Sequence, residues 1–355
     1  MILNESLLML TRLGIGHSHS TPFEPFKWEE TLALASQQGL LAVVVDGLEK
    51  VPINLRPEKG LILKLISEVL QVYESRYVEY RHAISDLAHF YNEHGFRMML
   101  LKGYACGLYW LNPNHRPYGD IDIWQFGDQI KSDEVLKRER RIKIDKGHHH
   151  HTVFIWNGFT VENHYDFINI HNHKSNLELE SVLKELGSDD THCIDCLGEK
   201  VYLPSPNLHS LFLLRHSMTD FAASRLTLRQ LLDWGFFVEA NKDKINWLWL
   251  EGILEKFGMI DLYKIFNAIC VIDLGFSAKL FQLIQFDPFL KDKVLQDILS
   301  TTISEHFPKG LFKRIVFKYQ RWRANEWKRK LCFTESQWSS FWGGVWSHLL
   351  KPSSI

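Results

Sequence analysis

The sequence has few cysteines, almost no net charge and no long apolar run. Its five cysteines are odd in number and widely scattered, which argues against a disulfide framework and favours a reducing cytoplasm. A formal net charge of -1 argues against nucleic-acid binding by the whole protein, because neutralising phosphates requires a surplus of lysine and arginine. A membrane-spanning helix needs roughly 18–20 uncharged residues, and no apolar segment reaches that length.

The N-terminal segment, 1–20, also lacks a leading cluster of basic residues. Glu5 and Arg12 interrupt its apolar residues, so we predict a helix there rather than a signal peptide.

The length and composition are those of a globular protein with more than one part. The 355 residues are 45% hydrophobic, and a single core usually stops growing at about this length. We predict three regions: an N-terminal helical region over 1–95 that packs on the core, a core over 96–203, and a helical C-terminal domain over 204–355.

Local patterns place strands in the middle of the chain. Residues 120–124 alternate polar and apolar side chains, as a half-buried strand does. Two strands over 152–155 and 159–167 are joined by Asn157-Gly158, the strongest short hairpin signal. The other predicted elements are a long amphipathic helix over 61–94 ended by Gly95, a strand over 97–101, a short helix over 104–111, a helix within 128–147, a strand over 200–203, and helices over 207–219 and 225–239.

The segment Asp120-Ile121-Asp122 places two carboxylates on one face of a predicted strand, since residues two apart point the same way. Two neighbouring carboxylates repel, and neither ionises freely without a compensating cation. A hard divalent ion such as Mg²⁺ prefers oxygen ligands and supplies that compensation. Taken alone, the same segment also fits a solvated strand edge with two ordinary surface acids.

The neighbouring segments favour the metal site. Lys102-Gly103 follows the strand predicted just before, where glycine lets a phosphate approach the backbone and lysine supplies positive charge. Glu162, His164 and Asp166 share one face of the second hairpin strand. A third carboxylate on a neighbouring strand is what two-metal phosphoryl transfer needs. For His164 a purely structural role is equally compatible with the pattern.

Three further segments have weaker signals. Arg116 suits a bidentate phosphate contact, although a loop salt bridge fits as well. The run His148–His151 could place one or two imidazoles beside Glu162 or bind metal adventitiously, and a polar strand edge is the simpler interpretation. Residues 309–330 are basic and aromatic, so they are either an interaction surface or a helix that packs its rings on the core.

The pattern Cys193-Ile194-Asp195-Cys196 has the spacing of half a zinc site. Structural zinc sites normally need a second ligand pair at similar spacing, and the sequence offers none. We therefore predict a β-turn with free thiols at this segment.

The order Lys102-Gly103, Arg116, Asp120-Ile121-Asp122 and Glu162-x-His164 resembles the uncharacterised nucleotidyltransferase family of the polymerase-beta-like superfamily. That family has a strand, L-K-G, a helix, R-x-x-x-D-I-D and a later strand with E-x-H. The resemblance extends over most of the chain. It implies an α+β fold with a small mixed β-sheet flanked by helices, followed by a helical C-terminal domain.

The resemblance also implies a reaction. A nucleoside monophosphate would pass from an NTP such as ATP to a hydroxyl-type acceptor (a small molecule, a protein or an RNA end), with release of pyrophosphate. A non-catalytic binding protein of the same fold and a metal-dependent phosphohydrolase are the alternatives. By this resemblance the catalytic and metal residues are Asp120, Asp122 and Glu162 with Mg²⁺ or Mn²⁺, and the nucleotide-binding residues are Lys102, Gly103, Arg116 and His164.

Two departures stand out against better-known nucleotidyltransferases. Lys102-Gly103 occupies the place of a Gly-Ser turn, so the serine hydroxyl that binds the triphosphate is missing. The third acid, Glu162, is a glutamate rather than the usual aspartate, which changes its reach but not its chemical type.

Overall fold

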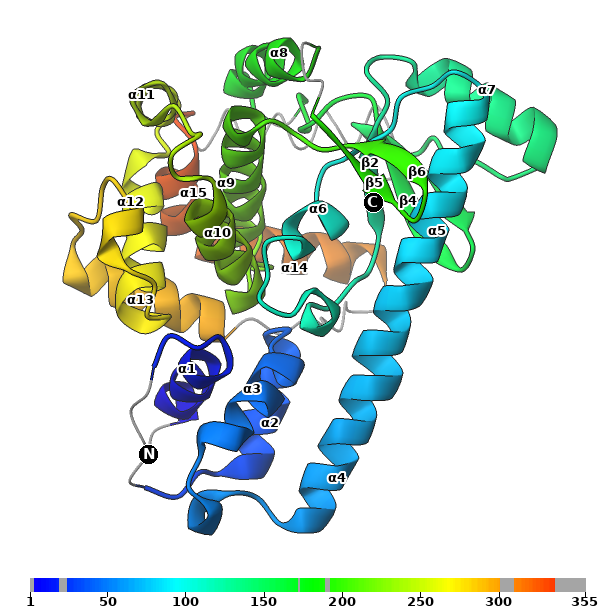
Figure 1. Ribbon diagram of the computed structural model, residues 1–355. Helices are drawn as coiled ribbons and strands as arrows, with labels where there is room; N and C mark the ends of the chain where they lie inside the picture. Colours follow the sequence, from blue (N-terminus) through cyan, green and yellow to red (C-terminus); the bar gives the residue numbers. More distant parts are fainter. Residues whose placement is uncertain (1–2, 19–23, 172, 189–191, 301–309, 336–355) are drawn as a thin grey trace. The chain divides into compact units, whose positions relative to one another are not determined.

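The computed structural model describes residues 3–18, 24–171, 173–188, 192–300 and 310–335, and its chain forms two compact units (Figure 1). The first unit takes Met1–Tyr73, Leu214–Lys242 and Trp247–Phe333, and the second takes Glu74–Leu213, Asp243–Asn246 and Thr334–Ile355. The division into three regions stays a prediction. Among the described residues, no helix is both long enough and apolar enough to cross a membrane.

The second unit is built on a six-stranded mixed sheet with the strand order β3-β4-β2-β1-β6-β5. Strands β2 and β4 are parallel, as are β1 and β6, whereas the pairs β1–β2, β3–β4 and β5–β6 are antiparallel. The sheet and the many helices confirm the predicted α+β class. The strands are β1 (Met99–Leu100), β2 (Ile121–Trp124), β3 (His151–Trp156), β4 (Phe159–His164), β5 (Cys193–Cys196) and β6 (Glu199–Tyr202).

The helices of this unit are α5 (Ser75–Glu93), α6 (Tyr104–Gly107), α7 (Gln129–Arg140) and α8 (Ser175–Ser188), with a 3-10 turn at Pro113–His115. One face of α5 packs against the sheet. Tyr80, Ile84 and Leu87 are buried there with Ile121 and Val161 of the strands. The predicted stripe of apolar residues on this helix is therefore its contact with the sheet.

The hairpin predicted at Asn157-Gly158 is confirmed. Both residues have positive φ, 46° and 81°, which is the backbone of the tight turn that suits twisted antiparallel strands. By contrast, the β-turn predicted at Cys193–Cys196 is wrong. These residues form β5, and the turn comes one step later at Leu197-Gly198, where φ is 54° and 91°.

A buried polar network connects α7 to the hairpin. The carboxylate of Asp133 accepts hydrogen bonds from Asn163 Nδ2 at 2.9 Å, from Thr152 Oγ1 at 2.8 Å and from the amide of Gln129. All four side chains are buried. Because Asn163 alternates with Glu162 and His164 along β4, the network supports the sheet from the face opposite to those two residues.

We expect Asp133→Ala to destabilise the protein by about 2–4 kcal/mol, because it leaves several buried polar groups without their partner. The measurement is the free energy of unfolding from urea titration. The neighbouring Glu134 is exposed, so Glu134→Ala is the matched control and should stay within about 0.5 kcal/mol. Equal stability of the two variants would contradict the role given to the network.

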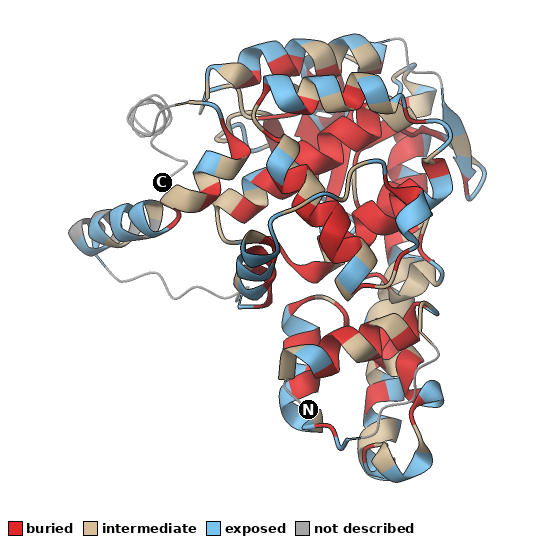
Figure 2. Cartoon of the chain, turned by 90° about the vertical axis from the view of Figure 1, so that its left-hand side faces the viewer, coloured by how far each residue is buried: buried red, intermediate tan, exposed pale blue. Residues whose placement is uncertain are grey.

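The first unit is helical. Helix α1 packs on α3, where Gly14 approaches the carbonyl of Val43 so closely that no side chain would fit. The predicted helix over 225–239 begins at Leu228 instead, because Thr227 and Gln230 form a capping box. This helix, α10, is buried along most of its length. Figure 2 colours the described residues of the chain by their burial.

The remaining helices are α1 (Leu3–Gly14), α2 (Trp28–Gln37), α3 (Leu41–Gly47), α4 (Lys59–Glu68), α9 (Pro206–Ala222), α10 (Leu228–Asn241), α11 (Trp247–Lys256), α12 (Ile260–Ala268), α13 (Pro288–Leu299), α14 (Leu311–Ala324) and α15 (Glu326–Cys332). Short 3-10 turns lie at Leu48–Lys50, Ile53–Leu55 and Ala278–Leu280, and π-helical segments at Val69–Glu74 and Ile269–Asp273.

Helices α14 and α15 carry the described part of the basic segment 309–330, and residue 309 lies outside the described residues. Lys328 is buried and pairs with Asp297 at 2.6 Å. The interaction surface at 309–330 stays a prediction.

Candidate active site

The pairing of β2 with β4 brings the predicted acids together. In this parallel pair Asp122 lies opposite Glu162, and Trp124 lies opposite His164. Residues directly opposite each other project from the same face of a sheet, so the two carboxylates share one face. Asp120 comes one residue before β2, and the charges of Asp122 and Glu162 both act on its carboxyl group.

Two cationic groups surround the carboxylate of Asp122. The Nζ atom of Lys102 lies 2.8 Å from Asp122 Oδ1, and Nε2 of His164 lies 3.3 Å from the same oxygen. Burial opposes ionisation of Asp122, but Lys102 and His164 outweigh it and hold the pKa of this carboxyl well below its usual range. Burial likewise opposes the charge of Lys102, and Asp122 and Asp120 together raise its pKa. The pair is therefore ionised.

Asp120 has a different environment. The residue reaches the surface, and the negative charge of Asp122 is the main cause that raises the pKa of Asp120. Its backbone carbonyl accepts a 2.7 Å hydrogen bond from the hydroxyl of Tyr80 on α5. A side chain at Gly103, where φ is 56°, would overlap that hydroxyl, so the position admits only glycine. The hydroxyl of Tyr80 thus lies against both predicted segments, whereas in the sequence Tyr80 is only one residue of the predicted amphipathic helix over 61–94.

Glu162 lies between two histidines. Its Oε2 atom is 3.7 Å from Nε2 of His164 and 3.7 Å from Nδ1 of His151. Burial opposes the charge of His164, but the carboxylates of Asp122 and Glu162 raise its pKa to about 9. Burial lowers the pKa of His151 to about 4, against the opposing charge of Glu162. His164 is therefore cationic near neutral pH and His151 is neutral, and His151 is the member of the histidine run that reaches Glu162.

Arg116 and Asp166, two residues of the predicted site, have partners other than the three acids. The side chain of Arg116 is buried, its Nη1 atom donates to the carbonyl of Pro117 at 3.1 Å, and its guanidinium faces the ring of Tyr118. Asp166 does not continue the face of Glu162 and His164, because β4 ends at His164 and the Asp166 carboxylate pairs with Lys184.

The donor atoms of this site suit a divalent ion. One ligand atom each from Asp122, Glu162 and His164 lie within 4.8 Å of one another. Two carboxylates in so small a space need positive charge, which Lys102 and His164 now supply. Carboxylate oxygens are the ligands of Mg²⁺ and Mn²⁺, so the residues fit the metal that the resemblance implies.

Comparison with known proteins agrees with this geometry. The profile of the uncharacterised nucleotidyltransferase family matches residues 24–267, more than half of the chain. The chain belongs to this family. Membership supports nucleotidyl transfer as its general activity and an NTP as its substrate class. No curated protein and no solved structure matches the chain significantly.

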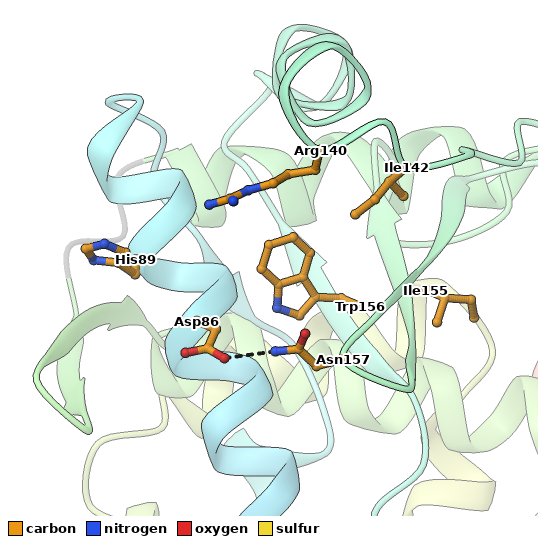
Figure 3. A pocket seen from close by; sticks show the side chains of 7 residues that line it. All are labelled: Asp86, His89, Arg140, Ile142, Ile155, Trp156 and Asn157. Carbon is orange, nitrogen blue, oxygen red and sulfur yellow. Dashed lines mark hydrogen bonds between the residues drawn. The ribbon is translucent and has the colours of Figure 1, made fainter.

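A pocket of about 460 Å³ (Figure 3) lies in the same unit of this nucleotidyltransferase, and Asp120, Asp122 and Glu162 are not among the residues that line it. Two of its lining residues bond to each other, since Asn157 Nδ2 donates a hydrogen bond to Asp86 at 2.8 Å. Along β3, Trp156 is five residues from His151, which is roughly 16 Å of extended strand. The lining residues are Asp86, His89, Arg140, Ile142, Ile155, Trp156 and Asn157.

Glu180 on α8 holds the chain just after β4. Its two carboxylate oxygens accept hydrogen bonds from the backbone N–H groups of Phe167 and Ile168, at 2.9 and 3.0 Å. Burial raises its pKa to about 7, even though both hydrogen bonds act to lower it. Glu180 is therefore a group whose folded pKa lies above its unfolded value of 4.5.

This shift predicts a pH dependence of stability. The contribution of Glu180 is fully present below pH 4.5 and is lost as the pH rises through about 7. Between pH 5 and 8 the wild-type protein should lose at most about 3 kcal/mol through this group. Denaturant titrations across this range compare it with Glu180→Gln, which should lack this part of the slope. Parallel stability curves for the two proteins would show that Glu180 does not titrate in this way.

Proposed function

We propose that this protein is a metal-dependent nucleotidyltransferase that moves a nucleoside monophosphate from an NTP to an acceptor hydroxyl. The observation that carries the proposal is the register of β2 and β4, which sets Asp122 opposite Glu162 with Asp120 just before them. Three acids at one point of a mixed sheet suit two-metal phosphoryl transfer. Membership of a nucleotidyltransferase family gives the reaction class.

In this proposal Asp120, Asp122 and Glu162 bind Mg²⁺ or Mn²⁺. The bound ions would neutralise charge on the triphosphate and on the attacking oxygen. Asp122 is oriented by His164, whose Nε2 atom lies 3.3 Å away. Glu162 is exposed enough, at 25% of its side chain, to take the proton of the acceptor hydroxyl.

The proposed reaction is a substitution at the α-phosphorus of the NTP. The acceptor oxygen forms a bond to the α-phosphorus, the bond from that phosphorus to the bridging oxygen breaks, and pyrophosphate leaves with the electron pair. The proposed nucleotide-binding residues, which position the triphosphate and stabilise its charge, are Lys102, Gly103, Arg116 and His164.

A second candidate is a non-catalytic binding protein of the same fold. The observation in its favour is the ammonium group of Lys102, which lies 2.8 Å from Asp122 and already supplies the positive charge that a metal would bring. In that case Lys102 takes the place of a metal ion, and the protein does not turn over NTP.

Pyrophosphate release separates the two candidates. Purified protein is incubated with each NTP and Mg²⁺ or Mn²⁺, and intact mass is recorded in parallel. Metal-dependent pyrophosphate release or a nucleotide-sized mass increase, lost in Asp120→Asn/Asp122→Asn, supports the transferase. Absence of both turnover and metal-dependent NTP binding, measured by calorimetry, supports the non-catalytic protein.

A further inference from the structure

Three imidazoles converge beside the carboxylates. Ring nitrogens of His150, His151 and His164 lie within 4.8 Å of one another. The hairpin register sets His151 opposite His164. The backbone carbonyl of His150 accepts hydrogen bonds from the N–H groups of Tyr165 and Asp166, at 3.0 and 3.1 Å, which fixes the start of β3 against the end of β4. The cluster is therefore held by backbone pairing on both strands.

We propose that His150, His151 and His164 form a binding site for a transition-metal ion of the Zn²⁺ class. Imidazole nitrogen suits zinc, cobalt and nickel, whereas Mg²⁺ prefers oxygen ligands. Glu162 borders the cluster, with its Oε2 atom 3.7 Å from Nδ1 of His151, and can add one oxygen ligand. This site shares His164 and Glu162 with the proposed Mg²⁺ site but takes most of its ligands from imidazole nitrogen, and binding of Zn²⁺ does not depend on nucleotidyl transfer.

The buried imidazole of His151 is available to bind a ligand. Its side chain is only 8% exposed. Neither of its ring nitrogens has a hydrogen-bond partner within the part of the chain that the structure describes. A buried polar group without a partner is destabilising, and such groups are rare in folded proteins. A metal ion bound to one nitrogen would satisfy it.

The orientation of His164 gives a second, independent indication. Its Nδ1 atom lies 3.2 Å from the backbone carbonyl of Asp166 and must donate there, because a carbonyl only accepts. In the metal-free protein Nε2 also carries a proton, and it lies 3.3 Å from Asp122 and 3.7 Å from Glu162. A bound metal ion would take the place of that proton on Nε2. Metal-binding histidines typically donate their other ring N–H to a carbonyl or carboxylate in this way.

Binding of Zn²⁺ to the full chain tests the proposal directly, without any assay of activity. The protein is treated with EDTA, dialysed, and titrated with Zn²⁺ by calorimetry and with Co²⁺ by visible absorption, in the presence of excess Mg²⁺. We expect one Zn²⁺ per chain with a Kd in the micromolar range or below, together with the Co²⁺ d–d bands of a nitrogen-containing site.

Two variants and a matched control locate the ion. His151→Phe conserves the ring and His150→Ala changes a less buried side chain, and each should weaken Zn²⁺ binding by about 100-fold or more. His149→Ala removes a histidine from the same run but outside the cluster, and should change Kd less than threefold. Thermal unfolding of each variant confirms that it is folded.

The proposal is overturned if the wild-type protein binds no Zn²⁺ at micromolar concentration. It is equally overturned if His150→Ala and a folded His151→Phe both bind as the wild type does. Equal weakening in His149→Ala would show that Zn²⁺ binds adventitiously to the run His148–His151 rather than to the cluster. Each outcome is independent of whether the protein transfers nucleotides.

Discussion

Replacing Asp122 with asparagine is expected to lower the rate of nucleotidyl transfer by on the order of 1,000-fold. The carboxylate of Asp122 lies opposite Glu162, and its side chain is 2% exposed. Losing about 4 kcal/mol of metal-borne charge stabilisation in the transition state corresponds to that factor. Pyrophosphate release with saturating Mg²⁺ and NTP measures it.

Because Asp122 is buried, loss of folding must be separated from loss of chemistry. Asp120→Asn changes an exposed residue and should lower the rate comparably with little effect on unfolding temperature. Asp128→Asn is the matched control, since Asp128 follows the same strand but pairs with the exposed Lys131. Activity of Asp120→Asn or Asp122→Asn within tenfold of wild type would exclude the proposed metal site.

The part of the site that follows from local pattern could be predicted from the sequence. Alternation along a strand put Asp120 and Asp122 on one face, and Asn157-Gly158 fixed the hairpin that carries Glu162. Both signals depend on neighbouring residues only. The predicted mixed sheet followed from the family resemblance rather than from these patterns.

Contacts between residues that are far apart in the sequence could not be predicted from local patterns. From the sequence, Lys102 is expected to bind the phosphates of the nucleotide. Its contact with Asp122 arises only because β1 pairs with β2. The strand at Cys193–Cys196 was missed because its turn begins with Leu197, which is not a typical turn residue.

The type of an element and its interruptions were also harder to predict than its presence. The segment 41–47 is apolar and buried at most of its positions, a pattern that fits a buried strand as well as a helix, and it forms α3. The helix predicted over 61–94 exists as α4 and α5, but a π-helical segment at Val69–Glu74 interrupts it. Such an insertion shifts the face of the helix without an evident mark in composition.

Lys102→Met is expected to make the stability of the protein depend on Mg²⁺. Lys102 and Asp122 form a buried ion pair, with side chains 17% and 2% exposed, and removing one partner of such a pair costs about 3 kcal/mol or more. In EDTA the unfolding temperature of the variant should therefore fall by roughly 10 °C. Differential scanning fluorimetry measures this fall.

Addition of Mg²⁺ should then reverse most of the loss. The carboxylates of the variant lack their ammonium partner, so they bind the ion more tightly, and Mg²⁺ at 100 times its Kd restores about 2.7 kcal/mol. Lys131→Met is the matched control, because Lys131 also lies 2.8 Å from an aspartate, Asp128, but that pair is exposed to solvent and contributes little to stability. If Mg²⁺ stabilises both variants equally, Lys102 does not compete with a metal for Asp122. If only Lys102→Met responds, the ammonium group occupies the place of the cation, and metal must displace it before the acids can act.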